Sequence, residues 1–228
     1  MNRRSFLQQC GFVTAGIALS GGMGLLPGRL LASHRRIRGF SLNLITDRPD
    51  EMVVRIEALI DRLNLPLGNL KFKEVSLSGT QVGDIVLVRN DLLIDYRSSQ
   101  DDFSEGLLAL AREFGLPRKM NAPALLRFYA QPRAQTAKQI SVYRKNVLVR
   151  QYNIDSEVDA DEIEGQNGSV VLTIKDKQTS IRAASCKHKT CMKMGRIRKP
   201  GQNLVCIPNQ IRIAIQGENE FGIDSLSF

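Results

Sequence analysis

Hydrophobic and polar residues alternate shortly after residue 36, where Phe40, Leu42 and Leu44 are separated by single residues. A period of two predicts a strand with one buried face. Asp47 and Pro49 then indicate the start of a helix, because proline suits the first helical turn. Apolar residues at helical spacing define the buried face of this helix. They are Met52, Ile56, Leu59 and Leu63.

Further strands and one more helix are expected next. Alternation returns over residues 70–77, and residues 84–96 have the pattern of a hairpin that turns at Asn90. A second amphipathic helix is expected over residues 102–114, ended by the glycine and proline just beyond it. The order β-α-β-β-β-α over residues 37–117 predicts a small α+β domain with its helices on one face of the sheet. We expect this domain to serve as an adaptor or dimerisation module.

A connecting segment is expected over residues 118–139, because Pro123 and Pro132 interrupt any long helix or strand. The apolar residues between these prolines could still form a short helix that packs between two domains. Strand patterns dominate residues 140–228, which predicts a second domain built from β-hairpins. The turns expected between its first strands are Lys145-Asn146, Gln166-Asn167-Gly168 and Asp176.

Two arginines near the first residue, Arg3 and Arg4, precede Phe6, Leu7 and a glycine-rich apolar run. This arrangement resembles a twin-arginine (Tat) export signal, whose pattern is R-R-x-F-L. The resemblance implies a signal peptide over residues 1–32, the Tat translocon as a partner during export, and a periplasmic protein. Glycines break the apolar run, so anchoring in the membrane is expected only if the leader is retained.

The net charge of the chain limits the kind of binding partner that we expect. The chain carries 32 Lys and Arg against 23 Asp and Glu, a formal net charge of +9, which favours an acidic partner. Nucleic acid is not expected as that partner, since there is little of it outside the cytoplasm. No acidic residue lies between Asp176 and Glu218, whereas basic residues are frequent there. We expect an anion or partner docking surface formed by Lys187, Lys189, Lys193, Arg196, Arg198 and Lys199.

The C-terminal region carries a recognisable set of motifs. They are V-Y-R-K-N-V-L-V, I-K-D-K-Q-T-S-I-R and C-x-x-K-x-C-M-x-x-G-x-I-x-x-P-G-Q-x-L-V-C-I-P-N. On these motifs residues 140–217 resemble the NusG domain II family. The resemblance implies a compact all-β, barrel-like module, and it brings no reaction with it. The resemblance does not imply a role in transcription, because the parts that transcription factors use are absent from the matching region.

Three cysteines of this region, Cys186, Cys191 and Cys206, leave several chemistries open. One disulfide, joining Cys206 to Cys186 or Cys191, would leave a buried free thiol. A metal site would instead add His188 and form a Cys3His set suited to zinc or another thiophilic metal. Nearby cations could also lower a thiol pKa and favour thiol–disulfide exchange. A Rieske cluster is disfavoured, because Asn209 stands where its second histidine is expected.

These observations predict an exported accessory or binding protein of the bacterial envelope without catalytic activity of its own. Its partner is expected to be an envelope protein, acidic or redox-active, and no cofactor is expected. The alternative is a thiol-redox or metal-carrying protein that acts in electron transfer or assembly through the cysteines. Catalysis by a cysteine with His188 lacks an obvious orienting residue, so we do not expect an enzyme.

Overall fold

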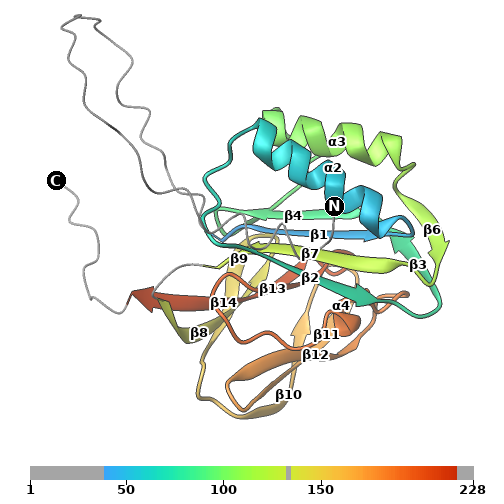
Figure 1. The fold of residues 1–228 in the computed structure, drawn as a ribbon. Coiled ribbons are helices and arrows are strands. Elements are labelled where there is room, and N and C mark those ends of the chain that lie inside the picture. Colours follow the sequence, from blue (N-terminus) through green and yellow to red (C-terminus); the bar gives the residue numbers. More distant parts are fainter. Residues whose placement is uncertain (1–38, 132–134, 220–228) are drawn as a thin grey trace, which may run out of the picture. The chain divides into compact units, whose positions relative to one another are not determined.

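The computed structural model of the chain describes residues 39–131 and 135–219. Antiparallel strands make up 49% of these residues. Three layers follow one another in Figure 1: two helices at the top, a five-stranded sheet in the middle, and the strands of the β-rich region below. The α+β fold class expected from the sequence is consistent with this arrangement. The expected signal peptide lies outside the described residues.

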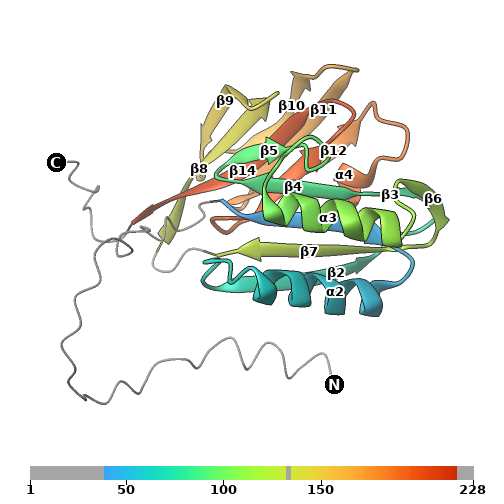
Figure 2. The ribbon, with the colours of Figure 1, turned by 90° about the horizontal axis from the view of Figure 1, so that it is seen from above.

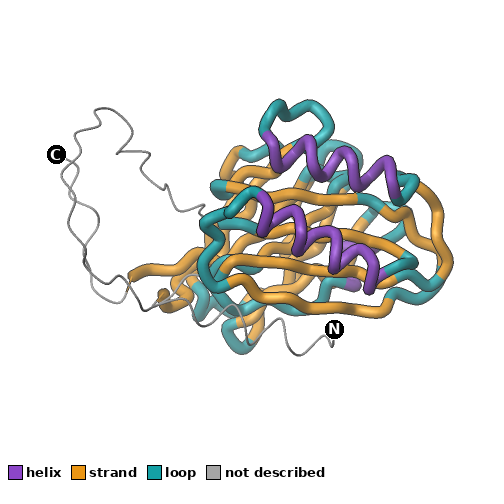
Figure 3. The backbone as a smooth tube through the Cα atoms, turned by 45° about the horizontal axis from the view of Figure 1, so that its top comes forward, coloured by secondary structure: helices purple, strands orange, loops and turns teal. Residues whose placement is uncertain are grey.

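The five-stranded sheet has the order β2-β7-β1-β4-β5, and every neighbouring pair is antiparallel. Its strands are β1 (Ser41–Thr46), β2 (Leu70–Ser76), β4 (Ile85–Arg89), β5 (Leu92–Ile94) and β7 (Ala124–Ala130). The helices that cover one face of it are α2 (Pro49–Arg62) and α3 (Asp102–Glu113) (Figure 3). Both helices and the β4–β5 hairpin agree with the sequence predictions. Asn90 and Asp91 turn that hairpin with positive φ values of 52° and 59°.

Local sequence accounts for both helices. Helix α2 has proline in its first turn and buries three apolar residues of its predicted face against the sheet. Helix α3 begins after Asp101, whose carboxylate accepts a hydrogen bond of 3.2 Å from the backbone N–H of Ser104. The guanidinium of Arg89 donates to both oxygens of the same carboxylate, at 2.7 and 2.8 Å. This pairing holds the pKa of Asp101 well below its usual range.

The prediction of a connecting segment over residues 118–139 is wrong. That stretch contains β6 (Arg118–Asn121), β7 and the start of β8 (Gln135–Arg144). Strand β7 lies between β2 and β1 inside the sheet (Figure 2), and its apolar run forms no helix. Pro123 precedes β7 and therefore does not interrupt it. Strand β6 pairs with β3 (Thr80–Gly83) in a two-stranded ribbon that the sequence pattern does not predict.

The β-rich region consists of two separate antiparallel sheets, with strand orders β13-β14-β8-β9 and β10-β11-β12. Their further elements are β9 (Val147–Asn153), β10 (Val158–Glu164), β11 (Ser169–Lys175), β12 (Gln178–Ala184), α4 (Thr190–Lys193), β13 (Asn203–Cys206) and β14 (Ile211–Asn219). The hairpins predicted to turn at Lys145-Asn146 and at Asp176 are confirmed. The barrel-like expectation is corrected, because the described strands form no closed barrel.

The second face of the five-stranded sheet packs directly on the β-rich region. Leu77 and Leu125 belong to the same buried cluster as the core of that region. Arg127 of β7 is only 5% exposed and donates hydrogen bonds to the backbone oxygens of Met194 at 2.8 Å and Asn203 at 2.6 Å. The described residues therefore belong to one compact unit, in which the two predicted domains share a core.

Candidate functional site

Three cysteine side chains meet beside the end of β13. Cys186 follows β12, Cys191 lies in α4, and Cys206 is the last residue of β13. The Sγ atoms of Cys186 and Cys191 are 3.8 Å apart, and all three Sγ atoms lie within 4.8 Å of one another. Their exposed fractions are 9%, 2% and 2%, in chain order. The structure therefore brings the three predicted cysteines together in a buried cluster.

One buried amide fixes the loops that carry these cysteines. Asn209 lies in the turn after Cys206, and its side chain is fully buried. Its Nδ2 donates to the backbone oxygen of Ser169 at 2.9 Å and to Oγ of Ser185 at 3.1 Å. Because Ser185 precedes Cys186, these bonds tie the turn after Cys206 to the start of the other cysteine loop.

The three thiols differ in how readily they ionise. A hydrogen bond from the Cys191 thiol, assisted by the backbone N–H of Asn209, lowers the pKa of the Cys206 thiol to about 6 despite its burial. Donating that bond, together with burial, raises the pKa of Cys191. Burial is the main cause that raises the pKa of Cys186. Of the three thiols, Cys206 is therefore the one that ionises most readily.

His188 does not join the cysteines, so the structure differs from the predicted Cys3His set. Its Nδ1 lies 3.4 Å from the backbone oxygen of Thr80 in β3. The adjoining side chain of Thr190 donates to Oε1 of Gln81 at 3.0 Å, which holds this segment against β3. A thiol–imidazole pair for nucleophilic catalysis is likewise not formed in this arrangement.

The predicted disulfide is also not formed, because the three cysteines of the described part of the chain are free thiols. A disulfide needs its sulfur atoms about 2.05 Å apart. The Sγ atoms of Cys186 and Cys191 are 3.8 Å apart, so this third pair is not bonded either. The pairing of Cys206 with Cys186 or Cys191 in an oxidising compartment stays a prediction.

Of the predicted docking residues, Lys187 and Lys189 adjoin the cysteines in the chain, whereas Arg196 and Arg198 lie near Gln178, at the end of β12 opposite Cys186. Lys193 donates from Nζ to the backbone oxygen of Ser78 at 2.8 Å, so it is committed to the fold. The other five predicted side chains are exposed, and none of them forms an ion pair within the described residues. They are Lys187, Lys189, Arg196, Arg198 and Lys199. Positive charge without internal partners is thus available for an anionic ligand.

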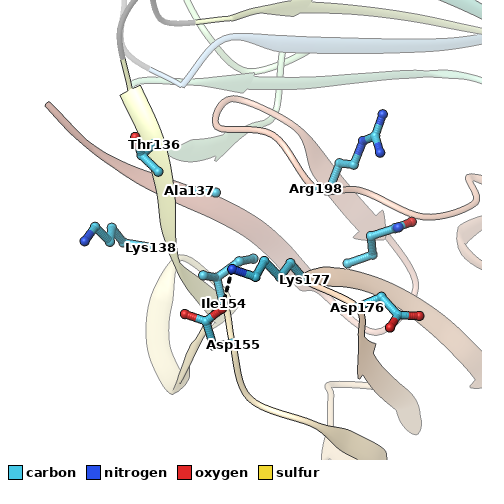
Figure 4. Close-up of a pocket in the computed structure, with 9 residues that line it drawn as sticks. Thr136, Ala137, Lys138, Ile154, Asp155, Asp176, Lys177 and Arg198 are labelled. Atoms are coloured by element: carbon cyan, nitrogen blue, oxygen red, sulfur yellow. Dashed lines mark ion pairs between the residues drawn. The ribbon is translucent and has the colours of Figure 1, made fainter. Parts of the chain in front are cut away.

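Arg198 also lines an open hollow of about 530 Å³ beside the β11–β12 turn (Figure 4). The hollow is charged, since Lys138, Asp176 and an exposed Lys177–Asp155 ion pair of 2.8 Å line it as well. Small-molecule sites are usually enclosed and mostly apolar. This hollow therefore does not have the character of an active-site pocket.

The roles of two buried arginines were not predicted from the sequence. Arg212, 1% exposed, lies over the ring of Tyr143 and donates to Oδ1 of Asn203 at 3.0 Å and to the backbone oxygen of Asp91. Arg127 binds the backbone oxygen of the same asparagine. Burial lowers the pKa of both guanidinium groups. Each interrupts an apolar strand run, L-L-R-F-Y or I-R-I-A-I, and that interruption is the signal that could have identified them.

The protein thus combines a helix-covered sheet with a β-rich module that carries a three-cysteine cluster. Residues 116–219 match the NusG domain II family, which supports a domain of that kind in this part of the chain. The match begins before residue 140 and includes β7. No curated protein matches the chain. Among the described residues, no helix is both long enough and apolar enough to span a bilayer.

Three solved bacterial structures are similar to the chain. A DUF1312 family protein from Ruminococcus gnavus is 25% identical with a TM-score of 0.31, over 35% of this chain and 99% of that chain. A DUF1312 family protein from Enterococcus faecalis is 18% identical with a TM-score of 0.33, over 36% and 98%. A protein from Listeria innocua is 14% identical with a TM-score of 0.35, over 42% and 84%.

Proposed function

We propose that this chain is an exported accessory protein of the bacterial envelope that binds an acidic partner and has no catalytic activity of its own. The observation that carries the proposal is the set of five exposed basic side chains in the segment from Lys187 to Lys199, none of which pairs with an acid of the described residues. Such a surface attracts an anionic partner and orients its approach. The orientation of His188 toward Thr80 supports binding rather than thiol catalysis.

Export is the first part of this proposal, and it rests on the resemblance of Arg3, Arg4, Phe6 and Leu7 to a Tat signal. Replacing Arg3 and Arg4 by lysine should keep the protein in the cytoplasm, because the translocon reads the paired arginines. Cell fractionation of a Tat-competent host measures this. Replacing Arg29 by lysine, outside the R-R-x-F-L pattern, is the matched control and should leave export unchanged. Normal export of the double variant would refute Tat dependence.

Docking of an acidic partner is the second part. A carbodiimide joins a lysine amine directly to a carboxylate that contacts it, so treated envelope fractions should contain the chain in a cross-linked adduct. Replacing Lys187, Lys189 and Lys199 by arginine should strongly reduce that adduct, because the positive charge stays while the reactive amine is lost. Replacing Lys71 of β2 and Lys145 of the β8–β9 turn by arginine should leave the yield unchanged. An equal adduct yield from both variants would show that the partner, if any, binds elsewhere.

A second candidate function is a metal-carrying or thiol-redox protein. The specific observation in its favour is the convergence of three buried sulfur atoms within 4.8 Å of one another. Thiolates in such a group bind thiophilic metals strongly.

A further inference from the structure

We propose that Cys186, Cys191 and Cys206 bind one thiophilic metal ion as three thiolates, without His188, and leave one coordination position open. This inference deepens the second candidate function, and its test uses purified protein only. Its failure would therefore leave the export and docking proposals standing, since those are measured in cells and by cross-linking.

The spacing of the sulfur atoms fits a metal ion. Zinc binds thiolate sulfur at about 2.3 Å in a tetrahedral arrangement, which places neighbouring sulfur atoms about 3.8 Å apart. The Sγ atoms of Cys186 and Cys191 are 3.8 Å apart, and the third Sγ lies within 4.8 Å of both. A disulfide would instead require a far closer approach of two of these atoms.

The ligand set decides which metals are suitable. Three sulfur atoms and no carboxylate form a soft donor set, which selects zinc or copper(I) over magnesium or calcium. Three thiolates give a net charge of −1 with a divalent ion and −2 with a monovalent one. The surrounding segment contains only basic charged residues, from Lys177 to Arg212, so its field stabilises a negatively charged centre.

The fourth position is open because the residue that could fill it points away. Nδ1 of His188 faces the oxygen of Thr80, and no other histidine, cysteine or carboxylate of the described residues joins the cluster. Structural zinc sites are almost always closed by four protein ligands, whereas sites with three keep a position for water or an incoming group. A three-thiolate site can therefore hold a small fourth ligand such as water, or hold copper(I) with the three sulfur atoms alone.

The positions of the ligands are fixed before a metal arrives. Asn209 bonds both to Ser169 and to Ser185, and this links the loops that carry Cys206 and Cys186. We assign Asn209 as a positioning residue of the site. Burial of all three thiols also limits their attack on an external disulfide, which favours metal binding over redox exchange.

The test titrates the reduced, metal-free full chain separately with Zn(II), Cu(I) and Co(II). Native mass spectrometry should find one ion per chain. The Co(II) form of the wild type should show a thiolate-to-metal charge-transfer band whose intensity corresponds to three thiolates, a reading that needs no variant. Competition with a chelator for Zn(II) and for Cu(I) decides which ion the site holds more tightly.

Variants separate this site from its alternatives. Replacing any one of the three cysteines by serine removes a metal ligand. The affinity for the metal should therefore fall by more than the roughly 10–100-fold that is typical of losing a hydrogen bond to a metal-binding side chain. His188→Ala should leave affinity and the Co(II) band unchanged. Asn209→Ala should weaken binding by about 10–100-fold while three thiolates remain in the spectrum. No bound ion in the reduced wild type, equal binding by a variant without the three cysteines, or a large loss in His188→Ala would each overturn the proposal.

Discussion

Arg127→Met is expected to lower the free energy of unfolding by about 3–5 kcal/mol, because it removes the donor that serves three buried hydrogen-bond acceptors. The guanidinium of Arg127 donates to Oδ1 of Asn43 at 3.2 Å and to the backbone oxygens of Met194 and Asn203. Methionine has a similar length and donates no hydrogen bond, so three acceptors lose their partner. Each buried acceptor left unsatisfied costs about 1–3 kcal/mol.

Chemical denaturation of the wild type and the variant measures this loss. Arg55→Met is the matched control, because Arg55 pairs with Glu113 at 2.9 Å on the surface and both side chains are at least 40% exposed. Surface pairs of this kind contribute up to about 1 kcal/mol. A loss in Arg127→Met that is no larger than in the control would show that Arg127 does not hold the two layers together.

Amide hydrogens of β7 are expected to exchange more slowly than those of an unfolded segment by a factor on the order of 10³ or more. The reason is that core strands exchange only when the whole protein unfolds. Strand β7 is such a core strand, since it pairs with β1 on one side and with β2 on the other. A connecting segment between two domains would show little protection. Hydrogen exchange followed by mass spectrometry of peptides covering Leu125 to Phe128 distinguishes these outcomes.

Strand β9 provides the comparison within the same molecule. It lies at the edge of its sheet, and six of its seven side chains are exposed. Its outward-facing amides should therefore exchange faster than those of β7. Protection in β7 no greater than in the outer amides of β9 would contradict the position of β7 inside the sheet.

The elements that could be predicted from the sequence are those whose patterns are local. Helix α2 has a single apolar face, and the hairpin turn at Asn90 lies between short alternating strands. Strand β7 has no such alternation, because both of its faces are covered. Leu126 faces the helices and Leu125 faces the β-rich region, so consecutive residues are both buried. The resulting apolar run between two prolines resembles a connection.

The candidate site could be predicted in part for a similar reason. Cys186, Cys191 and Cys206 lie in one region of the sequence, and their spacing predicts a shared role. The exclusion of His188 could not be foreseen. Its ring contacts Thr80, which lies 108 residues earlier in the chain, and only the packing of the β3–β6 ribbon beside α4 brings the two together.

The place of β7 between β1 and β2 also constrains the order in which the newly synthesised chain can acquire its structure. Strands β1 and β2 leave the ribosome early, but they do not pair with each other. Strand β1 can pair with β4 on one side, but its other side and β2 both wait for β7, which ends at Ala130, so the sheet stays incomplete until that residue has been made. Unpaired edges invite association with other chains. The nascent protein thus passes through a long stage at which premature termination would leave an aggregation-prone fragment.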